Sequence, residues 1–222
     1  MNTPFIQVVF SILRKDLRTE LRSRELVSSM ALFTFLSILV FSFALELDRE
    51  AKQEAVSGVL WVTLVFASIL GLNRSLASER EEGNMDAMLI APVNRIAIYM
   101  GKMLGNFIFT VIVGVVLLPV MTVLFNFSMV RPTMILILIL GILGLSSIGT
   151  LLATMTVQTR SRETLLPIAM LPVVLPVILT VVRATNAILN NQDMMQTLLT
   201  IGLVDVLYIT LGSFLFEYVT ED

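Results

Sequence analysis

The chain has 222 residues, of which 56% are hydrophobic and only 14% charged, whereas soluble proteins have about 25% charged residues. This balance places it among membrane proteins. A net charge of −2 without runs of like charge argues against a nucleic-acid partner. Because the chain has neither Cys nor His, it lacks the usual metal ligands and the commonest general base. No metal site is expected, and most classes of enzyme are excluded.

The N-terminal 25 residues do not have the order of a secretory signal. A cleavable signal passes from a basic region directly into an apolar core, whereas here "FIQVVFSIL" precedes "RKDLRTELRSRE". Apolar residues recur every three or four positions, at Ile6, Val9, Leu13, Leu17 and Leu21. We therefore expect residues 1–25 to form a basic amphipathic helix in the membrane interface. The alternative is a short helix packed against the protein's own cytoplasmic side.

Six apolar segments are long enough to cross about 30 Å of hydrocarbon as helices. They lie at about 26–45, 57–77, 103–125, 133–157, 164–182 and 197–216. The predicted fold is therefore all-α: a polytopic membrane protein with six transmembrane helices, in a single domain over residues 1–222.

The basic residues are distributed unevenly between the two sides of this arrangement. Eleven of the 15 Lys and Arg residues lie in the N-terminal segment, around the second loop or in the fourth loop. The other four lie on the opposite side. Since Lys and Arg favour the cytoplasmic side, we expect both termini and the 79–102 loop in the cytoplasm.

Two of the spans have an unusual composition. The fourth is rich in Gly, Ser and Thr between residues 141 and 154, which predicts close helix packing, either within the monomer or at a dimer face. The fifth contains Pro167, Pro172 and Pro176, which predict helix kinks. The resulting shape either contributes to gating or to a substrate path, or is a static irregularity.

Asp205 is an acid deep within the predicted last span. An uncompensated charge there is costly, so we expect the side chain to face protein or water, or to be protonated. It is either a functional group or a buried hydrogen-bonding group. The 13 Met residues are expected to serve packing rather than haem or copper ligation.

The stretch "EREEGNMDAMLIAP", residues 79–92, is a polar interruption between two apolar spans. Gly83 is suited to end the helix of the second span, and Asn84 to cap the next one. Pro92 ends that short helix, because the residue before proline avoids the α region. Asn94 is suited to cap the helix that leads into the third span.

Within this short helix, Met85, Met88 and Leu89 share one apolar face. A helix of about two turns is unstable alone and needs a surface to pack on. That surface is either the membrane or a groove on a soluble partner.

This region carries a family resemblance. The six spans, the N-terminal helix and the short helix after the second span resemble the permease of a type-2 (ABC-2) ATP-binding-cassette exporter. More closely, "LGLNRSLASEREEGNMDAMLIAPVNRIAIYMGK" is similar to the signature region of the CcmB family, the haem-exporter permeases of cytochrome c maturation. The residues that match the family pattern are Arg74, Glu79, Gly83, Leu89, Pro92 and Lys102.

The resemblance implies a bacterial inner-membrane permease subunit that is not itself an enzyme. ATP hydrolysis is expected in a separate CcmA-like subunit, since the chain has no G-x-x-x-x-G-K-[ST] motif. The residues expected to couple to that ATPase are Glu79, Glu81, Glu82, Gly83, Met85, Asp86, Met88, Leu89 and Pro92. In the interface expected there, the apolar side chains enter a groove on the ATPase and the acids surround its rim.

The resemblance further implies a CcmC-like haem-handling membrane subunit, a small CcmD-like accessory protein, a CcmE-like extracytoplasmic haem chaperone and possible pairing with a second copy of the chain. Haem is expected as a transported or presented substrate, handled mainly by the partner. Two other functions remain open from the residues alone: a proton- or ion-coupled carrier that uses Asp205, and an intramembrane enzyme. The second is disfavoured, because the spans lack paired acids and the chain has no His or Cys.

Overall fold

The computed structural model describes residues 4–45, 49–81, 83–90, 92–157, 162–190 and 192–219. Every regular element within these residues is an α-helix, as predicted. In chain order they are α1 (Phe5–Ser23), α2 (Glu25–Ala44), α3 (Arg49–Glu81), α4 (Asn84–Ile90), α5 (Arg95–Phe125), α6 (Pro132–Val157), α7 (Arg162–Leu189) and α8 (Met195–Val219).

Six helices in the described part of the chain are long and apolar enough to cross a membrane, which confirms the predicted number of spans. They are Glu25–Ala44, Ala55–Glu81, Arg95–Phe125, Pro132–Thr156, Thr164–Leu189 and Met195–Tyr218. Several are longer than predicted. Hydropathy marks only the apolar part of a helix, whereas helical hydrogen bonding continues into the polar residues on either side.

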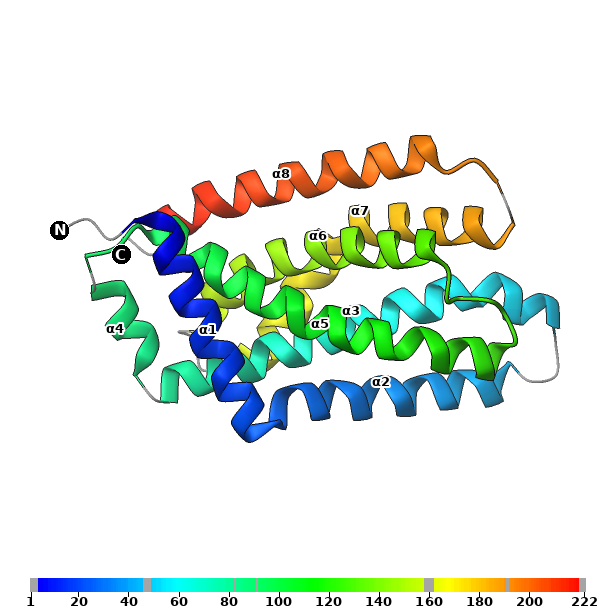
Figure 1. The fold of residues 1–222 in the computed structure, drawn as a ribbon, viewed down its shortest axis with the longest axis horizontal. Coiled ribbons are helices and arrows are strands. Elements are labelled where there is room, and N and C mark those ends of the chain that lie inside the picture. Colours follow the sequence, from blue (N-terminus) through cyan, green and yellow to red (C-terminus); the bar gives the residue numbers. More distant parts are fainter. Residues whose placement is uncertain are drawn as a thin grey trace.

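The six long helices run roughly along the long axis of the molecule, and α1 and α4 lie at one end of it (Figure 1). The last turns of α8 reach the same end, and α1 runs across this end at a steep angle to the long helices. If the long helices span a membrane, α1 therefore lies near the plane of the membrane surface.

The direction of α1 is fixed by the junction with α2. Arg24 adopts a left-handed conformation with φ of 56°, which turns the chain sharply between the two helices. The Glu20 carboxylate accepts hydrogen bonds from the backbone N–H groups of Leu26 and Val27, at 3.2 and 2.8 Å. These bonds satisfy N–H groups that the first turn of α2 otherwise leaves without a helical partner.

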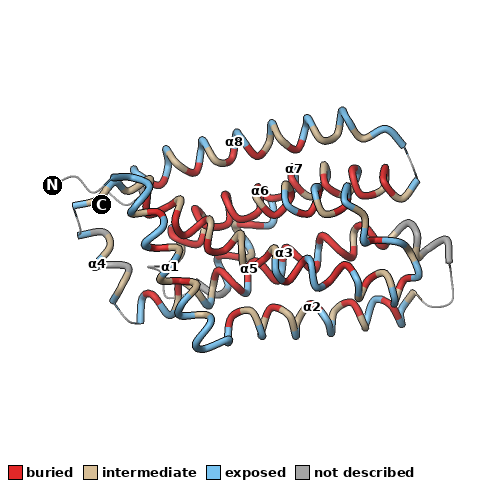
Figure 2. The backbone as a smooth tube through the Cα atoms, viewed as in Figure 1, coloured by how far each residue is buried: buried red, intermediate tan, exposed pale blue. Residues whose placement is uncertain are grey.

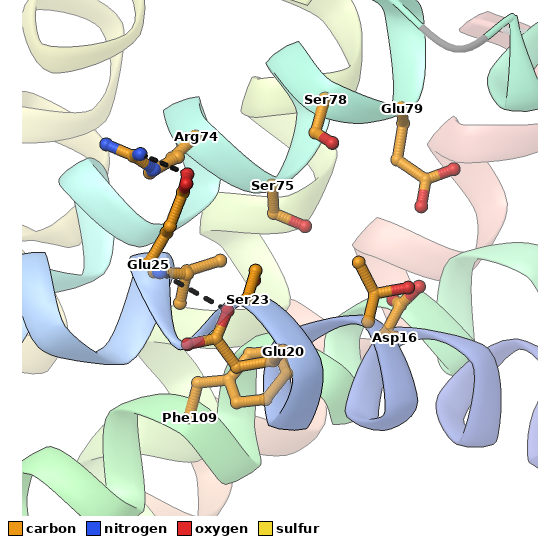
Figure 3. Close-up of a pocket in the computed structure, with 11 residues that line it drawn as sticks. Asp16, Glu20, Ser23, Glu25, Arg74, Ser75, Ser78, Glu79 and Phe109 are labelled. Atoms are coloured by element: carbon orange, nitrogen blue, oxygen red, sulfur yellow. Dashed lines mark hydrogen bonds and ion pairs between the residues drawn. The ribbon is translucent and has the colours of Figure 1, made fainter.

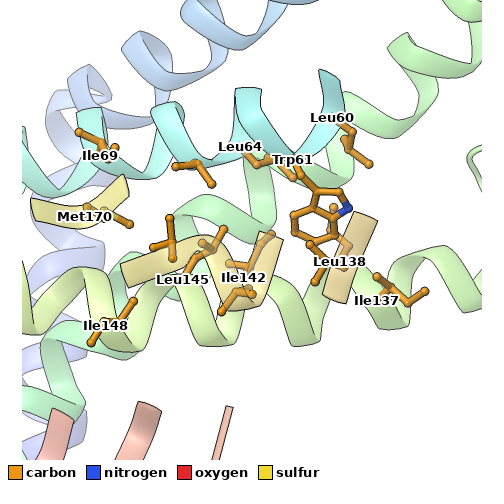
Figure 4. Packing of buried hydrophobic residues seen from close by; sticks show 14 of the residues in the cluster. Leu60, Trp61, Leu64, Ile69, Ile137, Leu138, Ile142, Leu145, Ile148 and Met170 are labelled. Atoms are coloured by element: carbon orange, nitrogen blue, oxygen red, sulfur yellow. The ribbon is translucent and has the colours of Figure 1, made fainter. Parts of the chain in front are cut away.

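α6 lies at the centre of the bundle and packs against α3, α5, α7 and α8. Its contact with α3 is a layer of interlocking apolar side chains (Figure 4). A Cβ added at Gly141 would clash with the Trp61 ring and lie 2.7 Å from Val181, and one added at Gly149 would lie 2.7 Å from Leu72. These small residues therefore allow close packing within the monomer, which decides against a dimer face at these positions.

The outer helices have a different surface. The apolar windows of α3 and α6 are mostly buried, whereas only about a quarter of those of α2, α7 and α8 is buried, and these three helices expose many large apolar side chains (Figure 2). An exposed apolar surface of this extent is expected where helices face lipid.

α7 remains helical through Pro167, Pro172 and Pro176, so the kinks expected there stay a prediction.

Candidate functional site

The polar segment between α3 and α5 begins with a glycine turn. Gly83 has φ of +68°, a conformation that glycine adopts without strain, and its N–H donates to the Arg80 carbonyl at 3.1 Å. The prediction that Gly83 ends the preceding helix is confirmed. Asn84 is the first residue of α4 rather than its cap, because the cap position falls on Gly83, whose carbonyl accepts from the Ala87 N–H at 3.2 Å.

The far side of α4 also follows the sequence pattern. The helix ends at Ile90, shortly before Pro92, which is exposed. The Asn94 side chain accepts a hydrogen bond of 2.8 Å from the Ile96 N–H and caps α5 as predicted. α4 is thus a short helix between two defined turns, at the same end of the bundle as α1 (Figure 1).

The predicted coupling surface on α4 is only partly visible. Met88 is half-buried and packs against the protein's own core, so less of it is available to a partner than expected. Ile90 is 84% exposed and Glu81 is exposed. The side chains of Met85, Asp86 and Leu89, and all of Glu82, lie outside the described residues. The role of this surface in coupling remains a prediction.

Glu79 is not at the rim of such a surface, and this corrects the expectation from the sequence. The last turns of α3 face α1, so Glu79 is only 8% exposed and points into the protein. Its Oε1 atom lies 2.7 Å from the Nζ of Lys102 and 2.5 Å from the Nζ of Lys15. Glu79 and Lys102, both expected from the sequence to match the family pattern, therefore form a buried ion pair between α3 and α5.

A third helix joins this pair through Asp16 of α1. Its two carboxylate oxygens lie 3.0 and 3.1 Å from the Nζ of Lys102, and the side chains of Asp16 and Lys102 are 7% and 5% exposed. We call Asp16, Glu79 and Lys102 the three-helix ion cluster. Figure 3 shows Asp16 and Glu79 facing the same space from α1 and α3.

Two glycines of α5 allow α1 to approach closely enough for this cluster. A Cβ added at Gly101 would lie 2.8 Å from the Ile12 Cβ, and one added at Gly105 would lie 3.2 Å from Asp16 Oδ2. These glycines are four residues apart and so lie on one face of α5. Small residues at this spacing let helix backbones come together.

The charges of this region balance. Lys15 is partly exposed at the edge of the cluster, so two ammonium groups face the two carboxylates of Asp16 and Glu79. Burial raises the pKa of Asp16, against the opposing attraction and hydrogen bonds of Lys102. Removing one member of such a cluster leaves a buried charge without compensation, which is strongly destabilising.

Arg74, also expected from the sequence to match the family pattern, lies beside the cluster but outside it. Its Nη2 atom is 2.5 Å from Glu25 Oε2, and both side chains are more than half exposed. A cavity of about 80 Å³ separates this pair from Glu79 and Asp16, between α1, α2 and α3 (Figure 3).

Asp205 lies far from this region along α8 and faces the protein interior, as predicted. It is 3% exposed, and a Cβ added at Gly144 of α6 would lie 2.5 Å from its Oδ1. Neither carboxylate oxygen has a hydrogen-bond partner among the residues that the structure describes. The structure therefore does not support the interpretation of Asp205 as a buried side chain held by hydrogen bonds.

Six long apolar helices, with one helix across their end and a short helix between the second and third, define a multi-pass membrane protein. A family model described as "CcmB protein" matches residues 7–220, so the chain belongs to the CcmB family.

Curated relatives agree over most of the chain. It is 26% identical over 208 residues to the heme exporter protein B of Pseudomonas aeruginosa, a match that covers 93% of each chain. It is 28% identical over 172 residues to the protein of the same name from Rhodobacter capsulatus, over 76% of this chain and 78% of that one. The heme exporter protein B of Bradyrhizobium diazoefficiens is 24% identical over 81% of both chains.

Proposed function

We propose that this chain is the transmembrane permease subunit of an ATP-binding-cassette transporter that handles haem during cytochrome c maturation. The observation that carries the proposal is α4, a short helix between two turns at the α1 end of a six-span bundle, in a chain of the CcmB family. The sequence contains no P-loop, so the hydrolysis of ATP is assigned to a separate CcmA-like subunit that binds α4.

The end of the bundle that carries α1 and α4 is assigned to the cytoplasm. The basic residues of α1 lie at this end, together with Arg74, Arg80, Arg95 and Lys102. Arg131 and Arg183 lie toward the other end. This asymmetry supports an inner-membrane protein with both termini in the cytoplasm.

α1 is assigned to the membrane interface with one face on the protein. Val9, Ile12 and Asp16 are buried against α5, as the alternative interpretation of this segment required. A second apolar stripe remains open to the outside, since Ile6 is 66% and Leu21 75% exposed. Exposed apolar residues beside arginines are what a helix in the interface presents to lipid.

Haem is proposed as the substrate of the complex rather than a cofactor of this chain. The sequence has no His or Cys to ligate haem iron, so a CcmC-like membrane subunit is assigned to hold it. A small CcmD-like protein, a CcmE-like chaperone and a second copy of this chain complete the proposed assembly. ATP-driven movements would then either export haem or release the loaded chaperone.

A second candidate function rests on Asp205. A buried carboxyl without a hydrogen-bond partner inside a span is the type of group on which a proton-coupled carrier depends. This alternative requires no ATPase, and it predicts transport driven by a proton gradient.

The test is purification of the tagged protein from its native membrane in mild detergent. The proposal predicts that a P-loop ATPase co-purifies in a fixed ratio, while an unrelated six-span protein with the same tag and expression level recovers none. Recovery without any ATPase, together with proton-driven transport in vesicles, would support the carrier instead.

A further inference from the structure

The three-helix ion cluster encloses the segment that carries α4. Glu79 lies in the last turn of α3 and Lys102 in the second turn of α5, and the whole of α4 lies between them in the chain. The ion pair of 2.7 Å between these two residues closes that excursion. The ends of α3 and α5 that flank α4 therefore cannot separate without breaking the buried Glu79–Lys102 ion pair.

Asp16 extends this connection to α1. It shares the Lys102 ammonium with Glu79, and its helix packs directly on the backbone of α5 at Gly105. Because the Glu20 carboxylate holds the first turn of α2, α1 and α2 are joined by a fixed junction. A continuous set of contacts thus leads from the two ends of the α4 segment to the first span.

The burial of three charged side chains costs desolvation free energy, so stability alone does not account for the cluster. Buried ion pairs are often no more stabilising than apolar residues of the same size, whereas their loss on one side is severe. The exposed Arg74–Glu25 pair nearby joins α2 to α3 without such a cost. The buried cluster differs from it in joining three helices through one ammonium group.

We propose that Asp16, Glu79 and Lys102 are positioning residues that transmit movement of α4 to the spans, with Asp16 as the link to α1 and α2. This inference rests on the proposed function, because it takes α4 as the point on which the ATPase acts. Asp16 is not expected to touch the ATPase, haem or ATP. Its loss should leave the ATPase bound but disconnect it from the first span.

The test measures ATP-dependent movement at the opposite end of the bundle, in the complex with its co-purified ATPase in nanodiscs. Reporter labels are placed by an azide-bearing amino acid at Phe43 of α2 and Met195 of α8, which are 69% and 64% exposed. The distance between the labels is measured with and without ATP. Bound ATPase and its hydrolysis rate are measured on the same samples.

For the wild type, ATP should change the label distance. Asp16→Asn, which removes the charge and keeps the size, should lose at least half of this change while binding the wild-type amount of ATPase. Lys102→Met should have the larger effect, because it removes the ammonium that joins α5 to the other two helices and leaves both carboxylates to the partly exposed Lys15. Glu25→Gln is the matched control, since it removes an exposed pair between neighbouring helices and should leave the distance change intact.

A cysteine pair separates the positioning role from a merely structural one. The Asp16 Cβ lies 3.7 Å from a Cβ built at Gly105, close to the separation of about 3.8 Å in disulfides, and the chain has no other cysteine. The reduced Asp16→Cys/Gly105→Cys variant should lose the distance change, and its oxidised form should regain it. Because a disulfide also stabilises a fold, the unfolding temperature of both forms is measured as well. A reduced variant that unfolds at the wild-type temperature but has lost the distance change has lost the positioning role and not its stability.

Three results would overturn the inference. The first is a label distance in the wild type that does not change with ATP. The second is an Asp16→Asn variant with the full distance change. The third is an oxidised cysteine pair that does not regain the distance change. In each of them ATPase is still bound. Absence of the ATPase from the wild-type preparation is a separate result, which contradicts the proposed function itself.

Discussion

The indole N–H of Trp61 donates a hydrogen bond of 2.9 Å to the Thr185 hydroxyl, which joins α3 to α7 in the buried core. The Thr185 hydroxyl in turn donates to the Val181 carbonyl at 2.8 Å, so both polar groups are satisfied. Gly141 of α6 lies directly against the same indole ring. Three helices therefore meet at the single tryptophan of the chain, and its fluorescence reports on their packing.

This contact predicts a large effect from a small substitution. Gly141→Ala places a methyl group against the Trp61 ring, and it should lower the free energy of unfolding by about 1–3 kcal/mol, as overpacking does elsewhere. The measurement is thermal unfolding in detergent, followed by tryptophan fluorescence. Gly202→Ala is the control, because a Cβ there meets no atom within 4 Å. Equal effects of the two substitutions would contradict the close packing.

The number of the spans and their positions in the sequence could be predicted because each signal is local. A bilayer requires long apolar helices, and the six apolar runs are visible in the sequence without any knowledge of their neighbours. The turn at Gly83 and the cap at Asn94 also depend only on residues a few positions away.

The three-helix ion cluster could not be predicted in the same way. Glu79 and Asp16 lie 23 and 86 positions from Lys102 in the sequence, and α1 carries several other charged residues besides Asp16. One local signal was available: Val9, Ile12 and Asp16 follow one another at spacings of three and four, and these three are the buried residues of α1. The pairing with Lys102 still requires the position of α5, which is set by Gly101 and Gly105.

The assigned orientation makes a prediction that the absence of native cysteine makes simple to test. Cysteine at Ser128, an exposed residue between α5 and α6, should be labelled in intact cells by a reagent that does not cross membranes. Cysteine at Ala87, exposed on α4, should be labelled only after the cells are opened. The reverse order of labelling would invert the topology.

Asp205 predicts a separation between stability and transport. Asp205→Asn removes a charge whose insertion costs about 2.5–3.5 kcal/mol, so the amount of protein in the membrane should be unchanged or higher. As a permease subunit, the variant should retain ATP-dependent activity with its ATPase. Loss of proton-driven transport in this variant would instead favour the carrier. A spin label at position 205 that reports lipid exposure would contradict the interior location.

The final prediction concerns α4 itself. Leu89→Asp should release the ATPase without reducing the amount of the variant in the membrane, because it places an unpaired charge among the expected apolar anchors of the interface. Buried apolar anchors carry most of the binding energy of an interface, and losing one costs about 2 kcal/mol or more, a decrease of about 30-fold in affinity. Glu81→Gln is the matched control on the exposed end of α3 and should weaken binding only slightly, mainly at low salt, where screening is weakest. The measurement is the ATPase recovered per unit of purified variant at two salt concentrations. Full recovery with Leu89→Asp would mean that α4 rests on the lipid surface, and that the ATPase binds the permease elsewhere.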